Sequence, residues 1–121
     1  MAHILLAEDD HSMLQFLQSA LERAGHQVTA RTDGLEALAA LDENTEFDLL
    51  LSDIVMPGMD GIELAQKAAK KRPNMQVMFI TGFAAVALGQ RDRMVKNAQL
   101  LSKPFHLNEL VEQVNRLLEA A

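Results

Sequence analysis

Residues with acidic, hydroxyl or amine side chains stand directly after four apolar runs of the chain. Glu8 and Asp9 follow the first run, and Asp53, Thr81 and Lys103 each end a later one. If these runs are strands of one parallel sheet, their carboxyl ends meet at one edge, which is where such sheets bind ligands. Two carboxylates about 4 Å apart repel by about 4 kcal/mol at an effective dielectric near 20. The cluster therefore needs a cation, and Lys103 offsets only one of its charges.

The residue types at this edge are suited to phosphoryl transfer. Carboxylate oxygens without cysteine ligands favour a hard ion such as Mg²⁺. An aspartate beside bound Mg²⁺ and a lysine can attack phosphorus and form an aspartyl phosphate, while the two cations stabilise the equatorial oxygens. The chain has no P-loop and no G-x-G-x-x-G loop, so we do not expect a bound nucleotide. These residues alone leave the phosphoryl donor unidentified.

Apolar runs alternate with segments of helical period along the whole chain. Strands are predicted at residues 3–7, 26–31, 47–53, 75–81 and 99–103, and helices at 12–25, 33–44, 61–72, 84–96 and 107–118. The strongest strands are apolar throughout, which is typical of a parallel sheet covered on both faces. We therefore predict an α/β fold, a doubly wound five-stranded parallel sheet flanked by five helices.

Composition narrows the class of protein further. A chain of 121 residues suffices for one domain, so we expect a single domain over residues 1–121 with no output domain. The net charge of −6 and the lack of Tyr and Trp argue against nucleic-acid binding. No apolar run is long enough for a bilayer, and the N-terminus does not resemble a secretory signal. Zero cysteines fit a reducing compartment. We expect a cytoplasmic protein with no membrane partner.

Some acidic residues have structural explanations. Carboxylates after the first strand also favour a helix N-terminus, and Asp10 is expected to cap the helix that follows. Asp60, with Glu63 three residues later, predicts a capping box rather than a metal ligand. The four histidines show no metal-ligand spacing, so we assign them no role.

Four segments, in this order, resemble the receiver domain of two-component response regulators: "LLAEDD", "LLLSDIVMPGMDG", "FITGFA" and "LLSKPF". The resemblance covers nearly every residue and implies the flavodoxin-like fold of the CheY-like superfamily. It implies that Asp53 accepts a phosphoryl group from a phosphohistidine on a histidine kinase or histidine phosphotransferase. Such a protein is no enzyme in the usual sense, since it catalyses only its own phosphorylation and dephosphorylation.

The same resemblance assigns roles to the other residues of the site. Glu8, Asp9, Asp53 and the backbone carbonyl of Val55 would bind Mg²⁺. Thr81 would bond a phosphoryl oxygen after modification, and Lys103 would pair with it. The peptide bond between Lys103 and Pro104 would be cis, which is rare outside X-Pro bonds.

More narrowly, the chain is similar to stand-alone receivers of the CpdR type, on "DIVMPGMDGIELA", "MFITGFAAVAL" and "LLSKPFHLNELV". That similarity implies an adaptor whose phosphorylation controls delivery of substrates to the ClpXP protease. A phosphorelay shuttle, passing the group to another histidine, stays open. An aspartyl-phosphate phosphohydrolase of the haloacid-dehalogenase type is a poorer fit, because it needs a second aspartate where Val55 stands.

Departures from the receiver pattern also carry predictions. Leu100 stands where the family often has Tyr or Phe, so we expect signalling through backbone shifts of the loop after Thr81, read out on residues 84–101. Val55 and Phe83 are apolar and flank the route of the hydrolytic water, which predicts slow self-dephosphorylation. The terminal Ala120–Ala121 pair is interpreted as a helix end, with a ClpXP degron as the alternative.

Overall fold

The chain folds around one parallel sheet in a computed structural model, which describes residues 2–43, 46–82 and 89–119. The strand order is β2-β1-β3-β4-β5, and all four pairings are parallel. The strands are β1 (His3–Ala7), β2 (Gln27–Arg31), β3 (Leu49–Asp53), β4 (Gln76–Thr81) and β5 (Gln99–Ser102). The predicted five-stranded, doubly wound sheet is confirmed.

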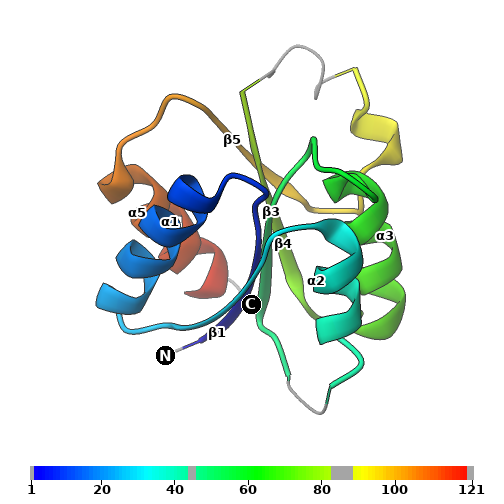
Figure 1. The fold of residues 1–121 in the computed structure, drawn as a ribbon, viewed down its shortest axis with the longest axis horizontal. Coiled ribbons are helices and arrows are strands. Elements are labelled where there is room, and N and C mark those ends of the chain that lie inside the picture. Colours follow the sequence, from blue (N-terminus) through cyan, green and yellow to red (C-terminus); the bar gives the residue numbers. More distant parts are fainter. Residues whose placement is uncertain (1, 44–45, 83–88, 120–121) are drawn as a thin grey trace.

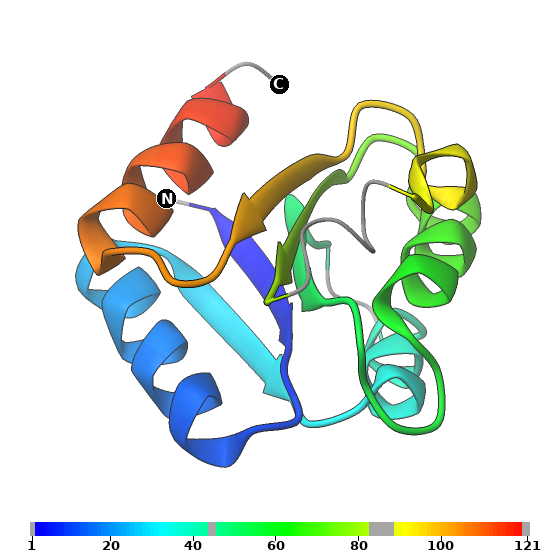
Figure 2. The ribbon, with the colours of Figure 1, turned by 90° about the horizontal axis from the view of Figure 1, so that it is seen from above.

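Helices cover both faces of this sheet. They are α1 (His11–Arg23), α2 (Gly34–Ala40), α3 (Gly61–Lys71) and α5 (Leu107–Glu119). Figures 1 and 2 show α1 and α5 together on one face, and α2 and α3 on the other. None of the helices in the described part of the chain has the length and apolar character needed to cross a bilayer.

The helix predicted at residues 84–96 is described only in part. Residues 83–88 lie outside the described ranges. In the remainder, a single 3₁₀ turn, η1 (Arg91–Arg93), forms. The backbone of Met94 is extended, with φ −75° and ψ 149°, so the helical turn ends there.

The strands bury side chains on both faces because successive residues point in opposite directions. Leu50 lies in the core beneath α2 and α3, whereas Leu49 and Leu51 lie in the core beneath α1 and α5. All three are fully buried. This double burial, worth about 1.5–3 kcal/mol for each large apolar side chain, explains why the strand is apolar throughout.

An aspartate caps the first helical turn after three of the strands. Asp10 accepts a hydrogen bond from the Met13 amide at 3.1 Å, and Asp33 accepts one from the Glu36 amide at 2.8 Å. Asp60 accepts one from the Glu63 amide, also at 2.8 Å. The caps predicted at Asp10 and Asp60 are confirmed, and each contributes about 1 kcal/mol. They start α1, α2 and α3 close to the carboxyl edge of the sheet.

Candidate functional site

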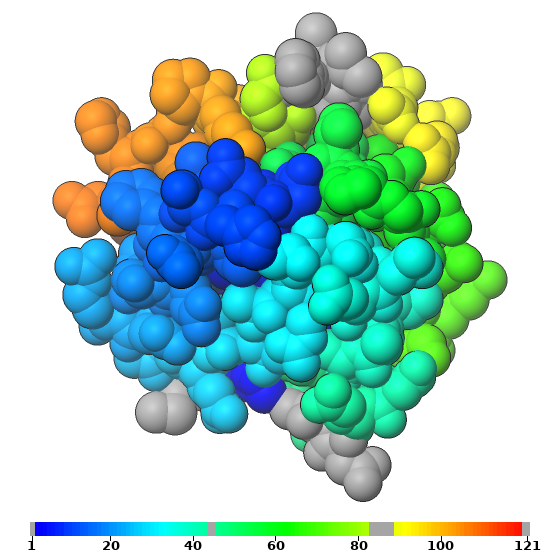
Figure 3. Space-filling view, in the orientation of Figure 1, coloured from blue at the N-terminus to red at the C-terminus, as the bar shows by residue number. Residues whose placement is uncertain are grey.

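Three carboxylates meet at the carboxyl edge of the sheet. The register pairs Ala7 of β1 with Ser52 of β3, so the next residues along each strand, Glu8 and Asp53, leave the sheet side by side. Glu8, Asp9 and Asp53 each place a carboxylate oxygen within 4.8 Å of the other two. Figure 3 shows the dark blue segment after β1 against the green segment after β3 on the molecular surface.

The side chain of Lys103 reaches this cluster from the end of β5. Its Nζ lies 3.3 Å from Asp53 Oδ2 and 3.7 Å from Glu8 Oε1. The backbone amide of Lys103 donates to the carbonyl of Thr81 at 2.7 Å, which ties the ends of β4 and β5 together. Thr81 is buried at this edge. The peptide bond between Lys103 and Pro104 is cis, as the sequence resemblance implied.

The two oxygens of the Asp53 carboxylate have different partners. Oδ1 accepts a hydrogen bond from the Ile54 amide at 2.9 Å, while Oδ2 faces the Lys103 ammonium. The side chain is 13% exposed. One oxygen is therefore held by the backbone, and the other is turned toward the charged cluster. Val55, two residues further, is exposed in the loop between β3 and α3.

Glu8 is the buried member of the cluster, with 1% of its surface exposed. Its Oε2 accepts from the Asp10 amide at 3.1 Å, while Oε1 is buried with no hydrogen-bond partner among the described residues. The pKa of Glu8 is raised from 4.5 to about 7, chiefly by burial and also by the charge on Asp53. The Asp10 amide and the Lys103 ammonium oppose this rise.

The donor set fits a hard divalent cation. When ionised, Glu8, Asp9 and Asp53 carry three negative charges, against one positive charge on Lys103. Glu8 Oε1 is a buried acceptor that receives no hydrogen bond from the described residues, with the Lys103 ammonium 3.7 Å away, and a cation bound there would satisfy it. Mg²⁺ prefers oxygen ligands of this kind and usually keeps several waters. The chemistry of the site therefore matches the magnesium site expected from the sequence.

Glycines allow the backbone to close tightly around the site. A Cβ on Gly61, the first residue of α3, would overlap the carbonyl oxygen of Asp53, and one on Gly34 would overlap that of Met59. The Gly61 amide donates to the Ile54 carbonyl at 2.7 Å. Sequence reasoning did not assign Gly61 a role. Its signal was a glycine at the first position of a predicted helix, where a helix former is expected.

One described residue singled out from the sequence does not join the cluster. Leu100 is partly buried and packs against the core beneath α2 and α3. Phe83 lies outside the described residues, as does the Ala120–Ala121 pair. Most of the residues expected to carry the readout, between 89 and 101, are described, and Met94 and Val95 pack against the same core as Leu100.

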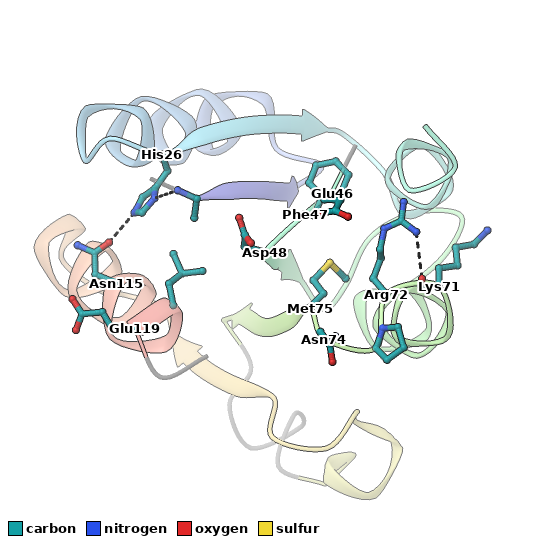
Figure 4. A pocket seen from close by; sticks show the side chains of 13 residues that line it. His26, Glu46, Phe47, Asp48, Lys71, Arg72, Asn74, Met75, Asn115 and Glu119 are labelled. Carbon is teal, nitrogen blue, oxygen red and sulfur yellow. Dashed lines mark hydrogen bonds between the residues drawn. The ribbon is translucent and has the colours of Figure 1, made fainter. Parts of the chain in front are cut away.

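A separate hollow of about 660 Å³ opens at the amino ends of the strands. Figure 4 shows its wall, where His26 bonds Asn115 of α5, at 2.7 Å between Nε2 and Oδ1. Asp48 and Met75 line it from the starts of β3 and β4. Among the described residues that line this hollow there is no member of the acidic cluster, which lies at the opposite end of the sheet.

Comparison with known proteins gives consistent matches along the chain. Residues 4–115 match the family described as "Response regulator receiver domain". The chain is 53% identical, over 121 residues and 100% of both proteins, to the response regulator receiver protein CpdR of Brucella abortus (strain 2308). It is 34% identical over 119 residues to the sensor kinase CckA of the same organism, covering 98% of this chain but 13% of that one.

The fold also matches solved structures. The crystal structure of a response regulator receiver protein from Sinorhizobium medicae WSM419 superposes with a TM-score of 0.90 and 34% sequence identity. The match covers 98% of this chain and 95% of that one.

Proposed function

The chain belongs to the receiver domain family of two-component response regulators, and from this premise we propose that Asp53 is its phosphoacceptor. The donor is a phosphohistidine on a histidine kinase or histidine phosphotransferase, and the reaction depends on Mg²⁺. One observation carries the proposal: Asp53 Oδ2 lies 3.3 Å from Lys103 Nζ, within a cluster of carboxylates suited to a divalent ion.

The chemistry follows from the separate environments of the two Asp53 oxygens. Oδ2 attacks phosphorus, a P–O bond forms, and the P–N bond to the donor histidine breaks with its electron pair returning to the imidazole nitrogen. Lys103 balances the charge that the phosphoryl oxygens bring, and the Thr81 hydroxyl donates to one of them. Mg²⁺ held by Glu8, Asp9, Asp53 and the Val55 carbonyl supplies further charge stabilisation when bound.

The output we propose is an adaptor role, in which phosphorylation controls delivery of substrates to the ClpXP protease in the cytoplasm. Full-length similarity to a protein named CpdR supports it. A phosphorelay shuttle is the second candidate, supported by similarity to a segment of the sensor kinase CckA. Both act through protein contacts, without nucleic-acid or membrane partners. Membership of a signalling family, rather than a catalytic one, argues against a phosphohydrolase.

Phosphorylation is tested by incubating the protein with acetyl phosphate and Mg²⁺ and measuring its intact mass. We expect a gain of one phosphoryl group that disappears in Asp53→Asn and in the presence of EDTA. Asp92→Asn, at an exposed aspartate of η1, is the matched control and should be modified normally. A modified Asp53→Asn protein, or an unmodified wild type, would contradict the proposed site.

The output is tested by binding to ClpX, with the wild type in both phosphorylation states and Asp53→Asn as the unphosphorylated control. An adaptor is expected to bind ClpX in one state and to lose binding in the other. Transfer of the phosphoryl group from Asp53 to a histidine phosphotransferase, with no ClpX binding in either state, would instead favour the shuttle.

A further inference from the structure

Ser52 is a buried polar residue in the otherwise apolar strand β3. It is 0% exposed, and its hydroxyl donates to the carbonyl oxygen of Asp53 at 2.7 Å. Gly61 leaves the space for this contact, because a Cβ there would lie 2.9 Å from Ser52 Oγ. The hydroxyl is therefore enclosed between the end of β3 and the start of α3, directly behind the phosphoacceptor.

The peptide unit between Asp53 and Ile54 is held at both ends. Its carbonyl accepts from Ser52, and its N–H donates to Asp53 Oδ1 at 2.9 Å. Because a peptide unit is planar, a donor that holds the carbonyl also sets the direction of the N–H. Hydrogen bonds in such a chain polarise one another, so the hydroxyl also strengthens the Ile54 N–H as a donor.

We propose that Ser52 is a positioning residue for the phosphoacceptor, acting through the Asp53–Ile54 peptide. By holding that peptide, Ser52 keeps Oδ1 bound to the backbone and turns Oδ2 toward Lys103 and the acidic cluster. The same peptide begins the loop that carries the Val55 carbonyl, so Ser52 also sets the path of that loop. The role rests on the proposed function of Asp53.

Removal of the hydroxyl in Ser52→Ala tests this role. We expect Mg²⁺ affinity to fall about ten-fold, the low end of the effect of groups that orient metal ligands. Phosphorylation by acetyl phosphate at a fixed, subsaturating Mg²⁺ concentration should slow by a similar factor. In the metal-free protein, the amide proton resonance of Ile54 should move upfield as its bond to Oδ1 weakens. Ser52→Thr, which keeps the hydroxyl, should restore all three.

A general loss of stability is separated from this role by Val114→Ala, a truncation in the core beneath α5. It should lower stability while leaving Mg²⁺ affinity and the Ile54 resonance unchanged. Ser52→Cys keeps a weaker donor, so its Mg²⁺ affinity and Ile54 resonance are expected to lie between those of Ser52→Ala and wild type. It replaces Ser52→Thr as the conservative variant if the threonine protein does not fold. A Ser52→Ala protein that matches wild type in the Ile54 resonance and Mg²⁺ affinity overturns the role. A wild type that acetyl phosphate does not modify overturns the proposed function instead.

Discussion

Replacing Glu8 by glutamine is expected to stabilise the metal-free protein at alkaline pH. The Glu8 carboxyl is buried, and its pKa rises from 4.5 to about 7. A raised pKa means that folding favours the neutral form, so this contribution to stability is complete below pH 4.5 and is lost as pH rises through about 7. The difference corresponds to about 3 kcal/mol in the free energy of unfolding. Glutamine has nearly the shape of the protonated acid and cannot ionise.

Urea unfolding in EDTA measures the effect at two pH values. Glu8→Gln is expected to gain about 3 kcal/mol over wild type at pH 8 and less than about 1 kcal/mol at pH 5, where folded Glu8 is already protonated. Glu112→Gln, at an exposed position of α5, should change little at either pH. Added Mg²⁺ should stabilise wild type, since a ligand of the folded state shifts unfolding by mass action. It should do so less for Glu8→Gln.

The reasoning is refuted if Glu8→Gln is no more stable than wild type at pH 8 in EDTA. An equal gain at both pH values would also refute it, because the gain would then not come from ionisation. Either result would mean that ionisation of Glu8 does not lower the free energy of unfolding.

Three further outcomes follow from the same site. Mg²⁺ affinity should fall as pH drops through about 7, because the proton bound by Glu8 competes with the metal; titrations giving the same Kd at pH 6 and pH 8 would contradict this. Gly61→Ala should lower the free energy of unfolding by about 2 kcal/mol, since the added Cβ overlaps the Asp53 carbonyl. Urea unfolding measures this loss. Gly25→Ala is the comparison for backbone strain alone, because a Cβ there meets open space while the backbone has a positive φ. Val55→Asn should shorten the lifetime of the phosphorylated protein by giving the exposed position a group that orients water, and an unchanged lifetime in a phosphate-release assay would count against that role.

The fold could be predicted largely because its strands are buried on both faces. Continuous apolar segments such as Leu49–Leu51, alternating with segments of helical period, favour a parallel sheet covered by helices. Capping residues such as Asp10 and Asp60 use local hydrogen bonds, so sequence spacing is sufficient to find them. The structure of the segment between β4 and β5 was harder to predict from the sequence. Met94 is extended and Val95 packs against the core, and neither property is encoded in helical periodicity.

The sequence by itself determined which residues stand at the strand ends, and so which side chains meet at the carboxyl edge. Only the tertiary structure decided how they meet. The pKa of Glu8 depends on how many atoms exclude water from it. The two Asp53 oxygens differ because the Ile54 amide bonds one of them and the Lys103 ammonium faces the other. Ser52 looked like one polar residue in a strand, yet Gly61 brings α3 close enough to enclose its hydroxyl behind Asp53. The approach of Lys103 to Asp53 joins residues far apart in the chain, and even the contact between neighbours Ser52 and Asp53 is enclosed only because another element packs on it.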